Sequence, residues 1–176
     1  MKFKVERLKI NYKTLEEFKK FKQYGRQELS MLEDLEANII DNDSESPFYG
    51  IYFGDRLVAR MSFYQIDAQF NRYFDPPKDY LELWKLEVLP DYQGKGYGKT
   101  LVDFAKSFSL PIKTNGRINS SDFWASMSFT PATYEVERDR GENPFIWYPE
   151  GVHEQLHYKK LLAPRFIPRR CFRSIF

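Results

Sequence analysis

The chain has 176 residues, of which 42% are hydrophobic and 30% are charged, with a formal net charge of +2. This length and composition predict one soluble globular domain with a substantial core. No apolar run reaches the roughly 18 residues that cross a bilayer, and the first residues lack a signal-peptide core. Cys171 is the single cysteine, so an internal disulfide is excluded and a cytoplasmic protein is expected.

The charges are unevenly distributed along the chain. Residues 157–176 contain six basic side chains and no acidic one, which leaves residues 1–156 mildly acidic. We therefore predict a domain over residues 1–156 and a basic C-terminal tail over residues 157–176. Pro164 and Pro168 interrupt the tail, which favours packing across the domain or a second subunit over binding to a membrane or to nucleic acid.

The first half of the chain predicts strands and helices in turn. A strand over residues 3–11 precedes two helices over residues 15–24 and 27–40, whose apolar side chains recur at helical spacing. Strands over residues 48–53 and 57–66 flank a short turn that contains a glycine, which predicts a β-hairpin.

The second half continues this alternation. Residues 80–89 form an apolar strand whose two faces both carry large side chains, as is typical of a central strand covered on both sides. The further predicted elements are a helix over 99–108, a strand over 110–114, a helix over 120–126 and strands over 132–138 and 145–148. This order predicts an α/β domain with a mixed sheet.

The segment Gln93–Lys99 between the central strand and the next helix contains three alternating glycines. Glycine has no Cβ, so its backbone N–H groups can approach a ligand closely and adopt positive φ. N–H groups just ahead of a helix add to the positive end of its dipole and bind phosphate. The segment therefore predicts an anionic ligand such as a diphosphate.

Two common nucleotide motifs do not fit this loop. A Walker A motif would need a glycine five residues before Gly98, where Gln93 stands. The dinucleotide fingerprint needs two residues between its second and third glycines, and only one separates Gly96 from Gly98. The pattern that fits is Gln-x-x-Gly-x-Gly, filled by Gln93, Gly96 and Gly98.

Together with Leu86-x-Val88-x-Pro90 ahead of it, this pattern resembles the acyl-CoA motif of the GNAT superfamily of N-acetyltransferases, in a single-domain bacterial type. The element order resembles that family from residue 3 to about residue 150. The resemblance implies a strongly twisted mixed sheet of six to seven strands with about four helices. It also implies acetyl-CoA as the acyl donor, no metal, and direct attack by a primary amine in a ternary complex.

The resemblance further implies where the donor binds. The pantetheine arm would pair with backbone near Leu86 and Val88, in a gap between the fourth and fifth strands, and the diphosphate would bind the amides of the glycine loop. The expected donor-binding residues are Leu86, Val88, Gln93, Gly94, Lys95, Gly96, Tyr97, Gly98, Lys99, Ser120 and Trp124.

Three positions depart from the family pattern. Trp124 stands where a tyrosine commonly protonates the leaving thiolate, and an indole N–H cannot usefully give up a proton. Arg117 stands near the position of the usual asparagine, with Asn119 close by, and Ser128 replaces a glycine. The source of this proton therefore stays open.

Glu82 is the predicted general base. It lies eleven residues before Gln93, the spacing of the base glutamate in the histone-acetyltransferase branch of the family. In a regular strand it would share a face with Trp84, Leu86 and Val88, and burial there would raise the pKa of its carboxyl. A solvent-exposed position near the start of the strand is the alternative.

Other side chains are candidates for the remaining proton transfers. Tyr134 is predicted to replace the missing acid, with Tyr148 as a second candidate, and core packing is the alternative for both. Glu87 lies on the opposite face of the strand as a second candidate base, or as the salt-bridge partner of a lysine. His153 and His157 are expected on the surface.

Two other functions remain open at this point. The Trp124 substitution also fits an acyl-CoA-binding regulatory module with little or no turnover, and the basic tail fits an interaction protein in which CoA is vestigial. The expected partner is an amine acceptor of unspecified identity, and a homodimer is compatible with the tail.

Overall fold

The computed structural model describes residues 3–21, 46–117 and 119–150. Its elements are β1 (Glu6–Arg7), α1 (Tyr12–Phe18), β2 (Phe48–Phe53), β3 (Arg56–Ile66), η1 (Ala68–Phe70), β4 (Tyr80–Val88), η2 (Pro90–Tyr92), α3 (Tyr97–Lys106), β5 (Ile112–Asn115), α4 (Ser121–Ser126), β6 (Thr130–Pro131), α5 (Val136–Asp139) and β7 (Pro144–Trp147). The predicted helix over residues 27–40 and the tail over residues 157–176 lie outside the described residues. The division into domain and tail therefore stays a prediction.

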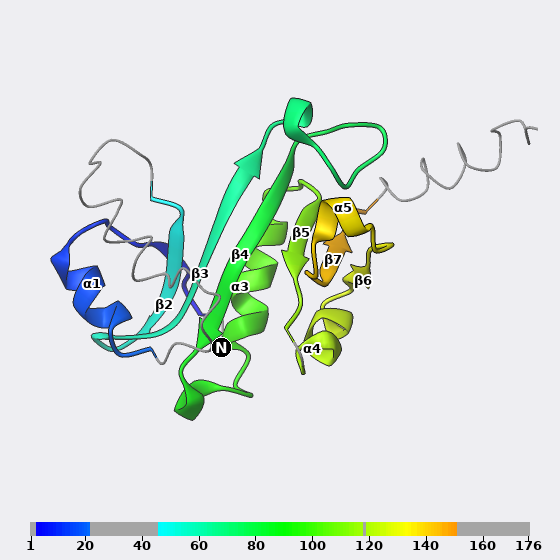
Figure 1. Cartoon of the computed structure of the whole chain (residues 1–176). Coiled ribbons are helices and arrows are strands. Elements are labelled where there is room, and N and C mark those ends of the chain that lie inside the picture. Colours follow the sequence, from blue (N-terminus) through cyan, green and yellow to red (C-terminus); the bar gives the residue numbers. More distant parts are fainter. Residues whose placement is uncertain (1–2, 22–45, 118, 151–176) are drawn as a thin grey trace, which may run out of the picture.

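The strands form one seven-stranded sheet in the order β1-β2-β3-β4-β5-β7-β6. The pairing of β4 with β5 is parallel and every other pairing is antiparallel. This mixed sheet, with four α-helices in the part of the chain that the structure describes, confirms the predicted fold class. The parallel pairing stops at Leu83 and Thr114, and beyond that point the two strands diverge, with α3 behind the gap (Figure 1).

Two apolar layers cover opposite faces of the sheet. On one face, Leu101, Val102 and Ala105 of α3 are buried against the largest core cluster, as the helical spacing predicted. On the other face, α1 packs over the hairpin, with Phe18 of α1 against Phe48 of β2. Asn11 starts α1 by accepting a hydrogen bond from the Thr14 N–H at 3.0 Å.

Several predicted boundaries shift. The first strand is confined to β1, because only Glu6 and Arg7 pair with β2. Helix α3 starts at Tyr97 and ends at Lys106, so Phe108 lies beyond it and is 45% exposed rather than buried.

The predicted strand over residues 132–138 is wrong. The chain there forms the short helix α5 instead, because the side chain of Asp139 holds the backbone in a turn. Its Oδ2 accepts a hydrogen bond from the Glu135 N–H at 2.8 Å, and its Oδ1 accepts one from the Tyr73 hydroxyl at 3.1 Å. The neighbouring strand β6 is limited to Thr130 and Pro131.

A β-bulge in β4 changes which side chains share a face. Leu83 pairs with Phe63 and Lys85 pairs with Ser62, so Trp84 is an extra residue in the strand. Leu81 and Leu83 before the bulge therefore lie on the same face as Leu86 and Val88 after it, all against the α3 core. The prediction that Glu82 shares a face with Leu86 and Val88 is wrong for this reason.

Candidate functional site

A cavity of about 810 Å³ lies where β4 leaves β5. Its walls are the second half of β4, the glycine loop with the start of α3, the residues after β5, and α4. Ten of the expected donor-binding residues line it, namely Leu86, Val88, Gln93, Gly94, Gly96, Tyr97, Gly98, Lys99, Ser120 and Trp124. The structure thus brings together residues of β4, the glycine loop, α3 and the start of α4 that were predicted to bind one ligand.

Two of the three glycines of the loop have a backbone conformation that favours glycine. Gly94 and Gly96 have φ of +72° and +88°, which residues other than glycine rarely adopt, and a Cβ at Gly94 would meet no atom within 4 Å. Gly98 lies inside α3, where a Cβ would be 3.4 Å from the Phe123 ring of α4, an ordinary van der Waals contact. The packing of α3 on α4 therefore does not by itself require a glycine there.

Short hydrogen bonds hold the loop in shape. The Gln93 amide donates to the Val88 carbonyl at 3.0 Å, and the Thr100 hydroxyl donates to the Gly96 carbonyl at 3.0 Å. The Lys95 ammonium donates to the Asp91 carbonyl at 2.7 Å. Lys95 is not among the residues that line the cavity, so its predicted contact with phosphate stays a prediction.

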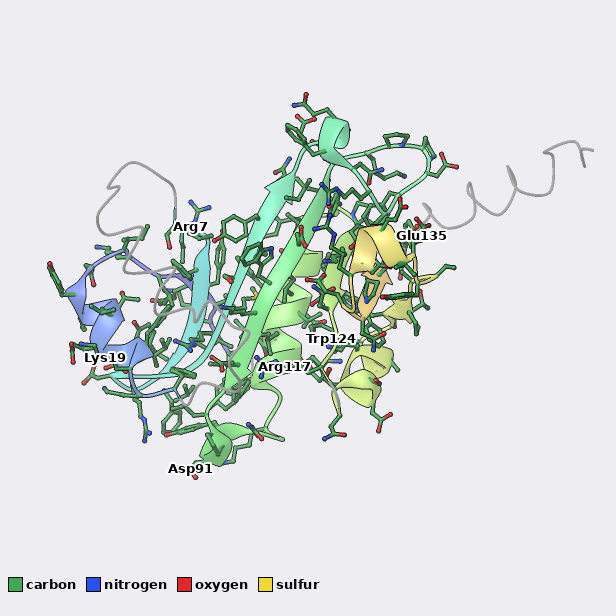
Figure 2. The ribbon with its side chains drawn as sticks, in the orientation of Figure 1. Arg7, Lys19, Asp91, Arg117, Trp124 and Glu135 are labelled. Carbon is green, nitrogen blue, oxygen red and sulfur yellow. The ribbon has the colours of Figure 1, made fainter. Side chains whose placement is uncertain are left out.

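Helix α4 closes the other side of the cavity. Trp124 is 5% exposed and packs edge-on against Phe123 and Phe129. Ser120 is the N-cap residue of α4, but its hydroxyl donates to the Arg117 carbonyl at 2.9 Å and makes no capping hydrogen bond to the helix. Arg117, which follows β5, and Trp124 of α4 both line the cavity and are labelled in Figure 2.

The predicted proton-transfer residues lie elsewhere. Glu82 accepts a hydrogen bond from the buried Lys113 ammonium at 2.8 Å, and Tyr134 accepts one from the Gly141 N–H at 2.9 Å in the segment next to α5. Neither is among the residues that line the cavity. Tyr148 packs against Phe74, and burial raises the pKa of its hydroxyl. The catalytic roles of Glu82 and Tyr134 stay predictions.

Two charged residues that line the cavity form an ion pair in the structure. Arg60 and Glu87 are cross-strand neighbours on β3 and β4, and the Arg60 Nε lies 2.9 Å from the Glu87 Oε2. The partner of Glu87 is therefore an arginine and not the expected lysine. In the sequence, an arginine inside an apolar strand indicates a buried charge that needs a partner. Only the pairing register of β3 with β4 shows that this partner is Glu87.

Burial dominates the electrostatics of Arg60. Its side chain is 2% exposed, and its guanidinium carbon lies 4.5 Å and 4.3 Å from the ring centres of Phe18 and Phe21. Burial lowers the pKa of Arg60, and the charge of Glu87 opposes this shift. The pair is thus rigidly held and desolvated on the arginine side.

Metal-binding clusters and membrane-spanning helices are both absent from the described residues. Residues 3–21, 46–117 and 119–150 contain no group of three or more His, Cys, Asp or Glu side chains placed to hold a metal ion. The same ranges contain no helix that is both long enough and apolar enough to cross a membrane.

Comparison with known proteins identifies the family. The model of the Acetyltransferase (GNAT) family matches residues 11–111, more than half of the chain. The chain belongs to this family. An uncharacterised N-acetyltransferase of Halalkalibacterium halodurans is 68% identical over 152 residues, which cover 86% of this chain and 90% of that protein.

Solved structures agree with this assignment. The crystal structure of the Bacillus subtilis N-acetyltransferase YlbP in complex with coenzyme A has a TM-score of 0.72 and 67% identity, and covers 84% of this chain and 97% of that one. The NatC complex bound to a Gag peptide and CoA has a TM-score of 0.57 at 12% identity, covering 85% and 99% of the two chains, and so shows the fold alone. The predicted family and the predicted enzyme class, an acetyl-CoA-dependent N-acetyltransferase, are confirmed.

Proposed function

We propose that this GNAT-family protein transfers the acetyl group of acetyl-CoA to a primary amine, on a small molecule or a protein, by direct attack in a ternary complex. The observation that carries the proposal is the cavity between the diverging strands β4 and β5, which combines a phosphate-binding loop with an open strand edge. The relative whose structure contains coenzyme A is 67% identical, which supports the same ligand here.

The residues of the cavity fit both the diphosphate and the pantetheine of coenzyme A. The backbone N–H groups of the Gly94–Gly98 loop and the ten-residue helix α3 suit the diphosphate, with Lys99 and Arg117 adding positive charge at the cavity wall. Because the pairing of β4 with β5 stops at Leu83, the β5-facing edge of β4 beyond it can bind the amides of pantetheine as a further strand would.

Acetyl-CoA supplies an acyl group activated as a thioester. An amine bound as its ammonium ion first loses one proton; a C–N bond then forms, the C–S bond breaks, and the attacking nitrogen loses a second proton while the leaving sulfur gains one, so that one proton is released overall. Cys171 is far from the motif in sequence and is the single cysteine, which favours direct attack over an acyl-enzyme. The positions of Glu82 and Tyr134 outside the cavity wall do not favour them for these proton transfers.

The first experiment measures the release of free thiol from acetyl-CoA in the presence of single alkylamines, polyamines and peptides. We expect thiol release to require an amine and the acetylated amine to appear in equal amount. Calorimetry with coenzyme A, on the same preparation, reports binding without turnover. Binding without thiol release from any amine would contradict the proposal and support the regulatory module that Trp124 in place of tyrosine favours.

A further inference from the structure

The bulge at Trp84 determines which side chains of β4 lie on the face of the sheet opposite α3. Lys85 and Glu87 follow the bulge and lie on the face turned away from α3, on which their neighbours Ser62 and Arg60 also lie. Both Trp84 and Glu87 line the cavity, and Trp84 is 49% exposed. The glycine loop and α3 lie on the opposite face, whereas α1 and Phe21 pack beside Arg60 on this one.

Within the Arg60–Glu87 pair, the carboxylate is the accessible member. The Glu87 side chain is 18% exposed, against 2% for Arg60. Both hydrogen bonds from the Arg60 Nε and Nη2 end on Oε2 of Glu87, so Oε1 is not used by Arg60. The Arg60 Nη1 donates to the Phe18 carbonyl at 3.4 Å, which completes its contacts on the buried side.

The charges around the cavity distinguish the two substrates. Lys99 of α3 and Arg117 after β5 line it as cations, which suit an anionic donor, whereas Lys85 lies on the same face of β4 as Glu87. Among the described residues of the cavity wall, Glu87 is the one acidic side chain. A carboxylate and an accessible indole in one cavity can bind an organic ammonium ion, through a charged hydrogen bond and a cation–π contact.

We propose that Glu87, held in position by Arg60, binds the ammonium group of the acceptor, and that Trp84 packs against the same cation. The acceptor is therefore an organic cation that enters over the face of β4 opposite α3, and not a neutral or anionic compound. This inference rests on the proposed function, because it assigns the acceptor side of the same cavity. Arg60 is a positioning residue in this arrangement.

The test compares cations with neutral analogues on the wild-type protein saturated with coenzyme A. Calorimetry measures the binding of alkylamines, a polyamine and short peptides with a free amino group, each beside its hydroxyl or acetylated counterpart. We expect the cationic member of at least one pair to bind about 10- to 100-fold more tightly. Equal affinity within every pair, or binding by no amine, would overturn the proposal.

Variants then assign the effect to Glu87. For the amines that bind, Glu87→Gln should raise the dissociation constant, and the KM where there is turnover, by about 10- to 100-fold. Glu87→Asp should restore part of the loss. Affinity for coenzyme A should not change. The matched control Glu16→Gln removes a charge from an exposed position on α1 and should leave amine binding unchanged.

The outcomes separate this inference from the proposed function. Turnover with an unchanged KM in Glu87→Gln overturns the inference and leaves the acetyltransferase intact. Amine binding that depends on Glu87, without thiol release from any amine, supports the inference and contradicts the proposed function. If Glu87→Gln fails to fold, the test uses Trp84→Ala, a substitution at a half-exposed site, together with the wild-type comparison. Loss of the aromatic face should weaken cation binding several-fold, and unchanged amine affinity would contradict the inference.

Discussion

Gly96 and Gly98 stand two residues apart but differ in what the fold requires of them. Gly96 has a left-handed backbone conformation, with φ of +88°, at the position just before α3, whereas a Cβ at Gly98 would make an ordinary van der Waals contact with Phe123. Spacing alone groups the two into one motif. The fold therefore requires glycine more strictly at Gly96 than at Gly98.

Gly96→Ala should weaken coenzyme A binding as well as stability. An alanine at φ of +88° costs about 1–2 kcal/mol, and relief of that strain would move the N–H groups that we propose bind the diphosphate. Gly54→Ala is the matched control, because Gly54 also has positive φ, +60°, but lies in the turn between β2 and β3. Calorimetry and urea unfolding should show that both variants lose stability and only Gly96→Ala loses affinity. Equal affinity in the two variants would contradict the assignment of the loop.

Glu87→Ala should destabilise the fold through Arg60. Without the carboxylate, a guanidinium that is 2% exposed loses its charge partner, and the free energy of unfolding should fall by about 3 kcal/mol. Replacing Arg60 by methionine in the same chain should recover most of this loss, because no buried charge is then left unpaired. Urea denaturation measures the free energy of unfolding of the single and double variants. If the losses from Glu87→Ala and Arg60→Met simply add in the double variant, the two side chains do not stabilise the fold as a pair.

At the scale of elements, β4 and α5 depart from the structure that their local sequence patterns predict. The alternation along β4 is broken by one bulged residue, and this reverses the face of every side chain after it. In α5, the side-chain hydrogen bonds of Asp139 replace the backbone pairing that a strand would have used. Val136, which an apolar strand would have buried, is instead 74% exposed.

Asp139 should make α5 sensitive to acid. Hydrogen bonds from the Arg138 guanidinium, above all, lower the pKa of this buried carboxyl from 3.8 to about 2. A lowered pKa in the folded state stabilises the protein above pH about 4, and this contribution is lost as the pH falls towards 2. Asp139→Asn should remove about 2 kcal/mol of that pH dependence. Thermal unfolding at pH 6, 4 and 3 measures it, and parallel curves for the two proteins would contradict the role.

At the scale of the whole molecule, the cavity lies on the boundary between two parts of one sheet. Strands β1 to β4 and strands β5 to β7 are joined across the parallel pairing by three residue pairs, Leu81 to Leu83 with Ile112 to Thr114, and by the shared core beneath α3. A ligand that fills the gap contacts both parts. Binding should therefore stabilise the molecule as a unit.

Coenzyme A should raise the melting temperature accordingly. At a ligand concentration 100 times the dissociation constant, binding to the folded state alone adds about 2.7 kcal/mol. For a chain of this size, that corresponds to a rise of about 5–10 °C. Differential scanning calorimetry with coenzyme A and with dephospho-coenzyme A as the comparison measures the rise. An unchanged melting temperature at that saturation would contradict binding in the cavity.

Much of this protein could be predicted from the order of its residues, because the signals involved are local. The hairpin of β2 and β3, the central strand, the glycine loop and the apolar stripe of α3 depend on neighbours within about one helical turn or one strand. The spacing of Gln93, Gly96 and Gly98 was likewise enough to select the family and its acyl donor.

The acceptor side of the cavity was decided by tertiary structure alone. Whether Glu82 or Glu87 lines the cavity depends on one bulged residue at Trp84, which only the pairing of β3 with β4 defines. The burial of Arg60 depends in turn on Phe18 and Phe21, some forty residues earlier in the chain. Glycine spacing is a property of the backbone, whereas the side chain that meets an amine is set by strand register and packing between distant segments.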